Sequence, residues 1–237
     1  MKRIGFVVAI QRELQAVFAK YGNPKEEIHI PGYNIFVYEI NNKEIYIIHS
    51  GCGNIAASSA TQVLISLYNV EIIINFGVVG GLDDSLFVDD VIIVDKVIHY
   101  DFDCSEIDVG VRKHQYERFE SEYIPVDRNI INKVKELLPN AKYVIDASGD
   151  KFVGNSEAKR ALNTNYGAHI CEMEAAGILI TSIRNNVPCL LIKAVSDDVN
   201  GGGADFAQNV HNAAIKAVDL VFNLLEKLYF FWLEIKF

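Results

Sequence analysis

The sequence has no long apolar run and no surplus of basic residues, and each absence excludes a class of protein. Nowhere do the ~18 consecutive apolar residues of a membrane-spanning helix occur, so we expect no membrane span. Lys and Arg number 22 against 31 Asp and Glu, which gives a formal net charge of −9. Because nucleic-acid phosphates require a clustered basic surface, this balance argues against a nucleic-acid partner, and no nucleic-acid-binding motif occurs.

Cysteine is also scarce, and its spacing is uninformative for metal or disulfide chemistry. The four cysteines lie far apart without a CxxC pair: Cys52, Cys104, Cys171 and Cys189. Such usage is typical of free thiols in a reducing cytosol. The segment Met1-Lys2-Arg3-Ile4-Gly5 enters a strand directly and carries no apolar targeting region, so we expect a cytoplasmic protein.

Apolar runs alternate with helical patterns along the chain, which indicates an α/β fold with a largely parallel central sheet. Strands are predicted at residues 3–9, 29–30, 33–40, 44–49, 71–76, 91–98, 142–145 and 189–195. Helices are predicted at residues 11–20, 54–68, 128–138, 172–185 and 206–228, with Asn54 as the cap of the second one. No repeat or linker interrupts this pattern, so we expect a single domain over residues 1–237.

Three predicted strands end in segments rich in glycine or acid, where ligands of open α/β sheets collect. These segments are Gly51-Cys52-Gly53, Gly77-Val78-Val79-Gly80-Gly81 and Ser196-Asp197-Asp198. A glycine-rich turn alone is weak evidence, because glycine also serves tight turns and close packing. The first segment approaches a dinucleotide fingerprint, but it follows a third or fourth strand instead of opening a βαβ unit, which disfavours a dinucleotide.

Carboxylates occupy two further positions of interest. Glu172 and Glu174 open an otherwise apolar helix, where they could simply complement the helix dipole. Spaced two residues apart they face different directions, so at most one is expected to point into a given pocket. Asp197 follows a buried strand beside Ser196, a position suited to delivering a proton, although an ordinary turn or cap aspartate would look the same.

The segment 98–104 contains a histidine, two aspartates and a cysteine. It lacks a histidine pair four residues apart or any other recognised ligand spacing, so we expect no metal site.

Six short motifs taken in order carry a family resemblance. They are Ala9-Ile10-xx-Glu13, Ser50-Gly51-x-Gly53, Asn75-x-Gly77-xx-Gly80-Gly81-Leu82, Ser148-Gly149-Asp150-x-Phe152, Glu172-Met173-Glu174-Ala175 and Ala194-x-Ser196-Asp197. Together they resemble the purine nucleoside phosphorylase/uridine phosphorylase superfamily, and within it the 5′-methylthioadenosine/S-adenosylhomocysteine nucleosidases. The resemblance covers almost the whole chain.

This resemblance implies a three-layer α/β/α fold around a central mixed sheet, a homodimer, a purine nucleoside substrate, and neither metal nor organic cofactor. It implies that Glu13 activates the attacking water and that Glu174, with the backbone of Met173, holds the ribose hydroxyls. Asp197, beside Ser196, would protonate N7 of the departing adenine, and its burial would favour the protonated form.

Further substrate-binding positions follow from the same resemblance. Phe152 would stack on the base, the backbone of Val153 would read the adenine edge, and Phe206 would cover the sugar and its 5′ group. Gly80 belongs to the same site. The loop that begins at residue 98 would cross a dimer interface towards the partner's 5′ pocket, and its basic continuation at 110–116 bears on which 5′ group is accepted.

Two departures from the family pattern touch the nucleophile side of the site. Val78 stands where a hydroxyl residue is common, and Lys193 stands where arginine is common. Phosphorolysis is disfavoured, because Val78 offers no hydroxyl and Glu13 would repel phosphate, leaving Arg12 and Lys193 as the nearby cations. Two alternatives to a hydrolase remain: a phosphate-dependent purine nucleoside phosphorylase and a catalytically weak nucleoside-binding protein.

The aromatic tail 228–237 would end a docked helix or join a subunit interface.

Overall fold

Three parallel strands with almost continuous apolar sequence form the centre of the computed structural model, which describes residues 2–108 and 110–227. They are β1 (Lys2–Val8), β5 (Ile72–Gly81) and β10 (Cys189–Asp197), with β5 paired to both of the others. Every residue of β10 is buried, as is nearly every residue of β5. Strands covered on both faces require such unbroken apolar runs, so the sequence pattern follows from their central place.

The remaining elements alternate along the chain as the sequence pattern indicates. The other strands are β2 (Glu26–Ile30), β3 (Tyr33–Ile40), β4 (Lys43–His49), β6 (Val91–His99), β7 (Tyr123–Pro125), β8 (Lys142–Ser148) and β9 (Ile170–Glu172). The helices are α1 (Gln11–Tyr21), α2 (Asn54–Tyr68), α3 (Arg128–Leu137), α4 (Ser156–Tyr166), α5 (Ala175–Arg184) and α6 (Gly203–Lys227).

The sheet is mixed, in the order β10-β6-β8-β9-β5-β1-β4-β3-β2. Because β5 also pairs with β10, the strands β5, β10, β6, β8 and β9 close into a ring within the described chain. Parallel pairs link β1 to β4 and β5, β5 to β10, and β8 to β6 and β9. The pairs β10–β6, β5–β9, β6–β7, β2–β3 and β3–β4 are antiparallel.

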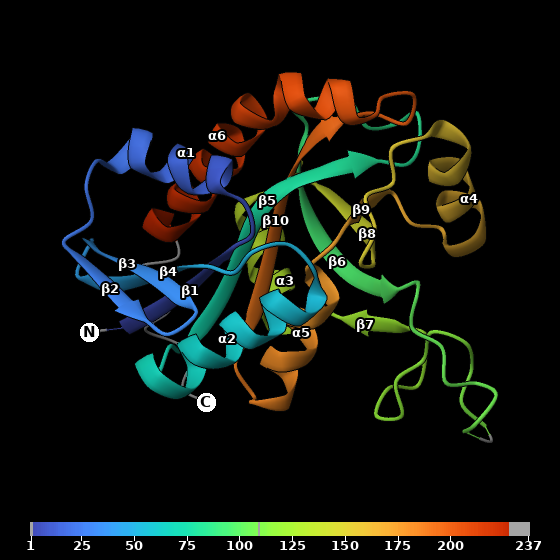
Figure 1. Cartoon of the computed structure of the whole chain (residues 1–237), viewed down its shortest axis with the longest axis horizontal. Coiled ribbons are helices and arrows are strands. Elements are labelled where there is room, and N and C mark those ends of the chain that lie inside the picture. Colours follow the sequence, from blue (N-terminus) through green and yellow to red (C-terminus); the bar gives the residue numbers. More distant parts are fainter. Residues whose placement is uncertain (1, 109, 228–237) are drawn as a thin grey trace.

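Helices cover both faces of this sheet, which confirms the three-layer α/β/α prediction (Figure 1). The long α6 and α1 pack together on one face, while α2 and α5 pack together on the other, with α3 on the same side (Figure 1). Helix α4 lies at one end of the molecule, beside β8 and β9 (Figure 1). No helix of the described residues is long and apolar enough to cross a membrane.

Several predicted boundaries are wrong, mostly near the glycine-rich segments. The strand expected to stop before Gly77 continues to Gly81, because Gly80 and Gly81 pair with β9. The helix expected from Glu172 begins at Ala175, since Ile170–Glu172 forms β9. The sequence analysis missed α4, β7 and β9 altogether. The aromatic tail lies outside the described residues.

The predicted cap of α2 is also wrong. Gly53, not Asn54, occupies the cap position, with φ of 98°. Asn54 is the first helical residue, and its side-chain oxygen accepts hydrogen bonds from Gly177 N at 2.7 Å and Ser148 Oγ at 3.3 Å. The side chain thus joins α2 to α5 and β8 instead of closing its own helix.

Candidate active site

A cavity of about 130 Å³, open to solvent, lies where β1, β5, β9 and β10 end. All the predicted site residues line it except Val153 and Lys193. Those in the wall are Glu13, Val78, Gly80, Phe152, Met173, Glu174, Ser196, Asp197 and Phe206. Positions spread over most of the sequence thus meet at one place, because the parallel strands deliver their carboxyl ends to the same edge of the sheet.

Glu13 is fixed by the backbone around it. Its Oε2 accepts hydrogen bonds from Ala9 N and Ile10 N, both at 3.1 Å, and its Oε1 accepts one from Val78 N at 2.9 Å. Burial raises the pKa of this carboxyl, while the bonds from Val78, Ile10 and Ala9 and the charge of Lys193 oppose the shift. Glu13 is therefore a buried, oriented carboxyl with a raised proton affinity, which suits a general base.

Val78 contributes to the site through its backbone. Its side chain carries no hydroxyl, but its N–H holds Glu13 directly. The chain approaches Glu13 so closely because Gly77 precedes it: a Cβ on Gly77 would overlap Glu13 Oε1 and lie 3.2 Å from the carboxyl carbon.

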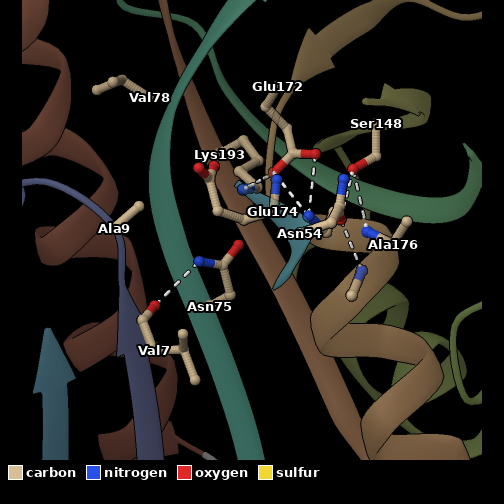
Figure 2. Close-up of polar contacts among 12 residues, drawn as sticks. Val7, Ala9, Asn54, Asn75, Val78, Ser148, Glu172, Glu174, Ala176 and Lys193 are labelled. Atoms are coloured by element: carbon tan, nitrogen blue, oxygen red, sulfur yellow. Dashed lines mark hydrogen bonds and ion pairs between the residues drawn. The ribbon is translucent and has the colours of Figure 1, made fainter. Parts of the chain in front are cut away.

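Glu172 and Glu174 both reach the cavity wall, but their carboxylates have different partners. Glu172 accepts from the backbone N–H groups of Glu174 and Ala175, at 2.8–3.0 Å, at the start of α5. It also pairs with Lys193, whose Nζ lies 3.0 Å from Glu172 Oε2 (Figure 2). The carboxylate of Glu172 is therefore occupied by the start of α5 and by Lys193. Glu174 is the one of the two that has fewer partners and could bind a ligand.

The pKa of Glu174, in the cavity wall, is strongly raised. Its Oε1 accepts from Gly53 N at 2.9 Å, and its side chain is almost wholly buried. Burial first, and then the charge of Glu172, raise its pKa to about 8, against the opposing effect of Lys193. The group therefore titrates near neutral pH, where its charge can respond to a bound ligand.

Lys193 lies behind the cavity instead of in its wall. It is 2 % exposed, and burial alone would lower its pKa. The charges of Glu172, Asp146 and Glu174 outweigh that effect and raise it. Lys193 therefore acts on the site through Glu172 and through its field, not by touching the cavity. Val153 is likewise 8 % exposed and packs in a small apolar cluster with Leu162 and Ala168.

Asp146 is a buried acid that the sequence analysis did not find. It lies on β8, has no exposed surface, and neither of its carboxyl oxygens has a hydrogen-bond partner among the described residues. Burial and the charge of Glu172 raise its pKa well above the ordinary value, while Lys193 opposes them. Because an isolated buried carboxylate is costly, Asp146 is held in its neutral form.

Asp197 is also buried, at 1 % exposure, and both of its oxygens are occupied. Ser196 Oγ donates to Oδ1 at 2.8 Å, and Lys159 Nζ donates to Oδ2 at 2.6 Å. The predicted burial is present, but the ion pair with Lys159 favours the ionised carboxylate, which the sequence analysis did not anticipate.

Two aromatic rings and a thiol complete the opening. Phe152 and Phe206 meet edge to face, with ring centroids 5.6 Å apart and an interplanar angle of 74°. Phe152 is still 48 % exposed, so its ring offers a free face to a ligand. Cys52 and Ile10 line the cavity near Glu13, and burial raises the pKa of the Cys52 thiol. All four cysteines are free.

A hydrogen-bonded frame holds these loops in place (Figure 2). Ser148 Oγ accepts from Ala176 N at 3.1 Å and donates to Asn54, which joins β8, α2 and α5 behind Glu174. On the other side, Asn75 Nδ2 donates to Val7 O at 3.0 Å and ties β5 to β1. The frame explains why the motifs around Ser148 and Asn75 accompany the residues that line the cavity.

Contacts between side-chain rings hold the segment 98–104 in place. The His99 ring lies between Asp101, 2.9 Å away, and the hydroxyl of Tyr116, 2.7 Å away, and Phe102 stacks on Tyr116. Within the part of the chain that the structure describes, no group of three or more His, Cys, Asp or Glu side chains is placed to hold a metal ion.

Comparison with known proteins defines the class of this fold and site. The sequence profile described as the phosphorylase superfamily matches residues 3–229, and the chain belongs to this superfamily. Among curated relatives, the 5′-methylthioadenosine/S-adenosylhomocysteine nucleosidase of Staphylococcus epidermidis is 30% identical over 95% of this chain and 100% of its own.

Solved structures have the same fold. The nucleosidase of the same name from Helicobacter pylori superposes with a TM-score of 0.88 and 23% identity, over 96% of this chain and 99% of its own. A futalosine hydrolase of Helicobacter pylori gives the same TM-score and identity, over 96% of this chain and 98% of its own.

Proposed function

We propose that this chain hydrolyses the N-glycosidic bond of 5′-methylthioadenosine and S-adenosylhomocysteine and releases adenine. One observation carries the choice of water over phosphate as nucleophile. The cavity wall contains the carboxyl groups of Glu13, Glu172, Glu174 and Asp197, and no Lys, Arg or His among the described residues. Phosphate, an anion, would be repelled there, whereas neutral water is not.

The two cations predicted near the site, Arg12 and Lys193, do not offset the negative charge of the cavity wall. Arg12 is exposed and outside the cavity, and Lys193 is buried in its pair with Glu172. The proposed reaction accordingly needs neither a metal nor an organic cofactor.

Glu13 is the proposed general base. A water near its carboxylate would lose a proton to Glu13 as it adds to C1′ of the ribose. The raised proton affinity of the buried carboxyl favours that transfer, and the bonds from Ala9, Ile10 and Val78 keep the group oriented.

Glu174 and Asp197 would act on the two products of bond cleavage. The sugar departs with cationic character, which an ionised Glu174 on its hydroxyls stabilises, beside the backbone of Met173. Adenine is a poor leaving group as an anion, so N7 takes a proton from Asp197, which Ser196 and Gly80 border. Phe152 would stack on the base and Phe206 would cover the sugar, with the backbone of Val153 at the adenine edge.

We further propose a single domain that forms a homodimer. A continuous mixed sheet runs through the described chain, which supports one domain. The connection from β6 to β7 projects from the body of the molecule (Figure 1). Ile107, in this connection, is 81 % accessible. Such a projecting loop suits contact with a second copy, and measurement of the oligomeric state in solution tests this proposal.

A substrate panel tests the proposed function. The purified protein would be incubated with methylthioadenosine, S-adenosylhomocysteine, adenosine, inosine and futalosine, and released base followed by chromatography. We expect adenine from the two 5′-thio nucleosides. Binding of these nucleosides without release of any base would contradict the proposal and identify a binding protein.

A further inference from the structure

Lys159 is a fully buried cation that none of the roles above uses. It lies in the first turns of α4, and its side chain has no exposed surface. Its Nζ donates to Asp197 Oδ2 and to Asp198 O, each at 2.6 Å. A lysine so deeply buried requires partners for its charge, and its ammonium finds them on the proposed acid and the following carbonyl.

The ammonium lies directly behind the cavity wall. A Cβ added to Gly80, which lines the cavity, would be 3.2 Å from Asp197 Oδ2 and 3.5 Å from Lys159 Cε. The helix that carries Lys159 also follows the segment with Phe152 and Val153. One ion pair thus connects the segment proposed to bind the base to the acid proposed to protonate it.

The hydrogen bonds around Asp197 match an ionised carboxylate. Both of its oxygens accept, one from the Ser196 hydroxyl and one from the ammonium. Hydrogen bonds with a charged donor favour the ionised form, and no other cation pairs with Asp197 among the described residues. The geometry is therefore that of a carboxylate paired with an ammonium.

Other titratable groups near the pair are already occupied or neutral. Burial raises the pKa of the Cys171 thiol on β9, so this thiol stays neutral. Asp198 accepts from the backbone of residues 200 and 201, and Asp205 on α6 accepts from Gly202 N. Glu172 is bound to Lys193. None of these side chains replaces Asp197 as the ion-pair partner of Lys159.

We propose that Lys159 is a positioning residue for the leaving-group step: it holds Asp197 in place and supplies, through Asp197, the proton that N7 receives. This inference rests on the proposed nucleosidase function. The nucleosidase proposal makes Asp197 the direct donor of the proton to N7. The inference adds the origin of that proton, because an Asp197 that is ionised in the free protein has none of its own to give.

When the C1′–N9 bond breaks, its electron pair stays on adenine, and N7 takes a proton from Asp197. Asp197 takes one from Lys159 Nζ, which is left as a neutral amine, the form that burial favours. The attacking water gives its proton to Glu13. After the products leave, solvent returns a proton to Lys159 and removes one from Glu13.

The pH profile of Lys159→Met tests this proposal. In this variant Asp197 must supply its own proton, which it loses as the pH rises. We expect kcat for adenine release to fall about 100-fold at alkaline pH, with the alkaline limb displaced to lower pH and KM little changed. Arg160→Met, one residue on and exposed, is the matched control, because the Arg160 guanidinium donates hydrogen bonds to Asp84 and Asn200 and not to Asp197. Its profile should match that of the unaltered protein.

The outcomes separate the two proposals. If the unaltered protein releases no base, the proposed function fails. If it is active and Lys159→Met keeps the same alkaline limb, or loses activity equally at every pH, the role of Lys159 is overturned.

An infrared measurement covers the case in which Lys159→Met does not fold. We expect Asp197→Asn to leave the protonated-carboxyl band of the free protein unchanged at neutral pH, because Asp197 is already ionised. Loss of part of that band would overturn the proposal.

Discussion

Gly77 lies against Glu13 with no room for a side chain, since a Cβ at this position would overlap Glu13 Oε1. Gly77→Ala should therefore displace the carboxylate. Because a misplacement of about 1 Å can cost about 100-fold, we expect kcat to fall by at least ~10-fold and up to ~100-fold. Gly203→Ala is the matched control, as nothing lies within 4 Å of its Cβ position. Equal rates for both variants would show that Glu13 is not the base.

Val78→Ser adds a hydroxyl at the nucleophile side without removing the N–H that holds Glu13. We expect the hydrolytic rate to stay unchanged or to rise, because a hydroxyl offers a further hydrogen bond to the attacking water. Steady-state rates of adenine release measure this directly. A large loss would show that the Val78 side chain belongs to a different arrangement of the nucleophile.

Asp197→Asn removes the group proposed to transfer the proton to N7. Turnover should fall by about 100-fold or more, while some nucleoside affinity remains, because Glu174 and the aromatic pair are untouched. Calorimetric titration and rate measurements separate the two effects. The variant also leaves Lys159 buried without its charged partner, so its free energy of unfolding should fall by up to about 3 kcal/mol. Full activity would refute the leaving-group mechanism.

The pKa of Glu174, at about 8, predicts a pH dependence of activity. Only the ionised form stabilises a cationic sugar, so kcat/KM should rise with pH towards about 8 and level off above it. In Glu174→Gln we expect a much lower kcat/KM that no longer rises with pH over this range. A profile that falls over the same range would exclude ionised Glu174 as the working form.

The same pKa predicts a stability difference of definite sign. The folded protein binds the Glu174 proton more tightly than the unfolded chain does. The stabilisation is complete below the ordinary glutamate pKa and is lost as the pH rises through about 8. Glu174→Gln should therefore gain stability relative to the unaltered protein as the pH rises from the ordinary glutamate pKa of 4.5 to about 8. Denaturant unfolding across this range measures the difference, and parallel curves would contradict it.

The cavity residues could be predicted mainly through the family resemblance, which their motifs carry. Apolar runs located the strand end beside Asp197, but Glu13 and Phe206 lie within helices and no strand pattern marks them. The central strands were predictable from the sequence pattern itself, since β1, β5 and β10 are buried on both faces and read as continuous apolar runs.

The charge pairs behind the cavity could not be predicted in this way. Lys159 lies on α4, whose polar sequence gave no helical signal, and its partner Asp197 is 38 positions away. Asp146 is hidden within a short strand, and its neutral form depends on Glu172 and Lys193 arriving from two other elements. Such groups are defined by three-dimensional proximity and burial alone, so a pattern along the chain does not reveal them.

Dependence on phosphate tests the central claim most directly. Methylthioadenosine would be supplied with and without inorganic phosphate, and the sugar product analysed by mass spectrometry. The carboxylate-lined cavity predicts adenine release at the same rate in both conditions, with unphosphorylated 5-methylthioribose as the product. A strict requirement for phosphate, with a sugar 1-phosphate as the product, would contradict hydrolysis.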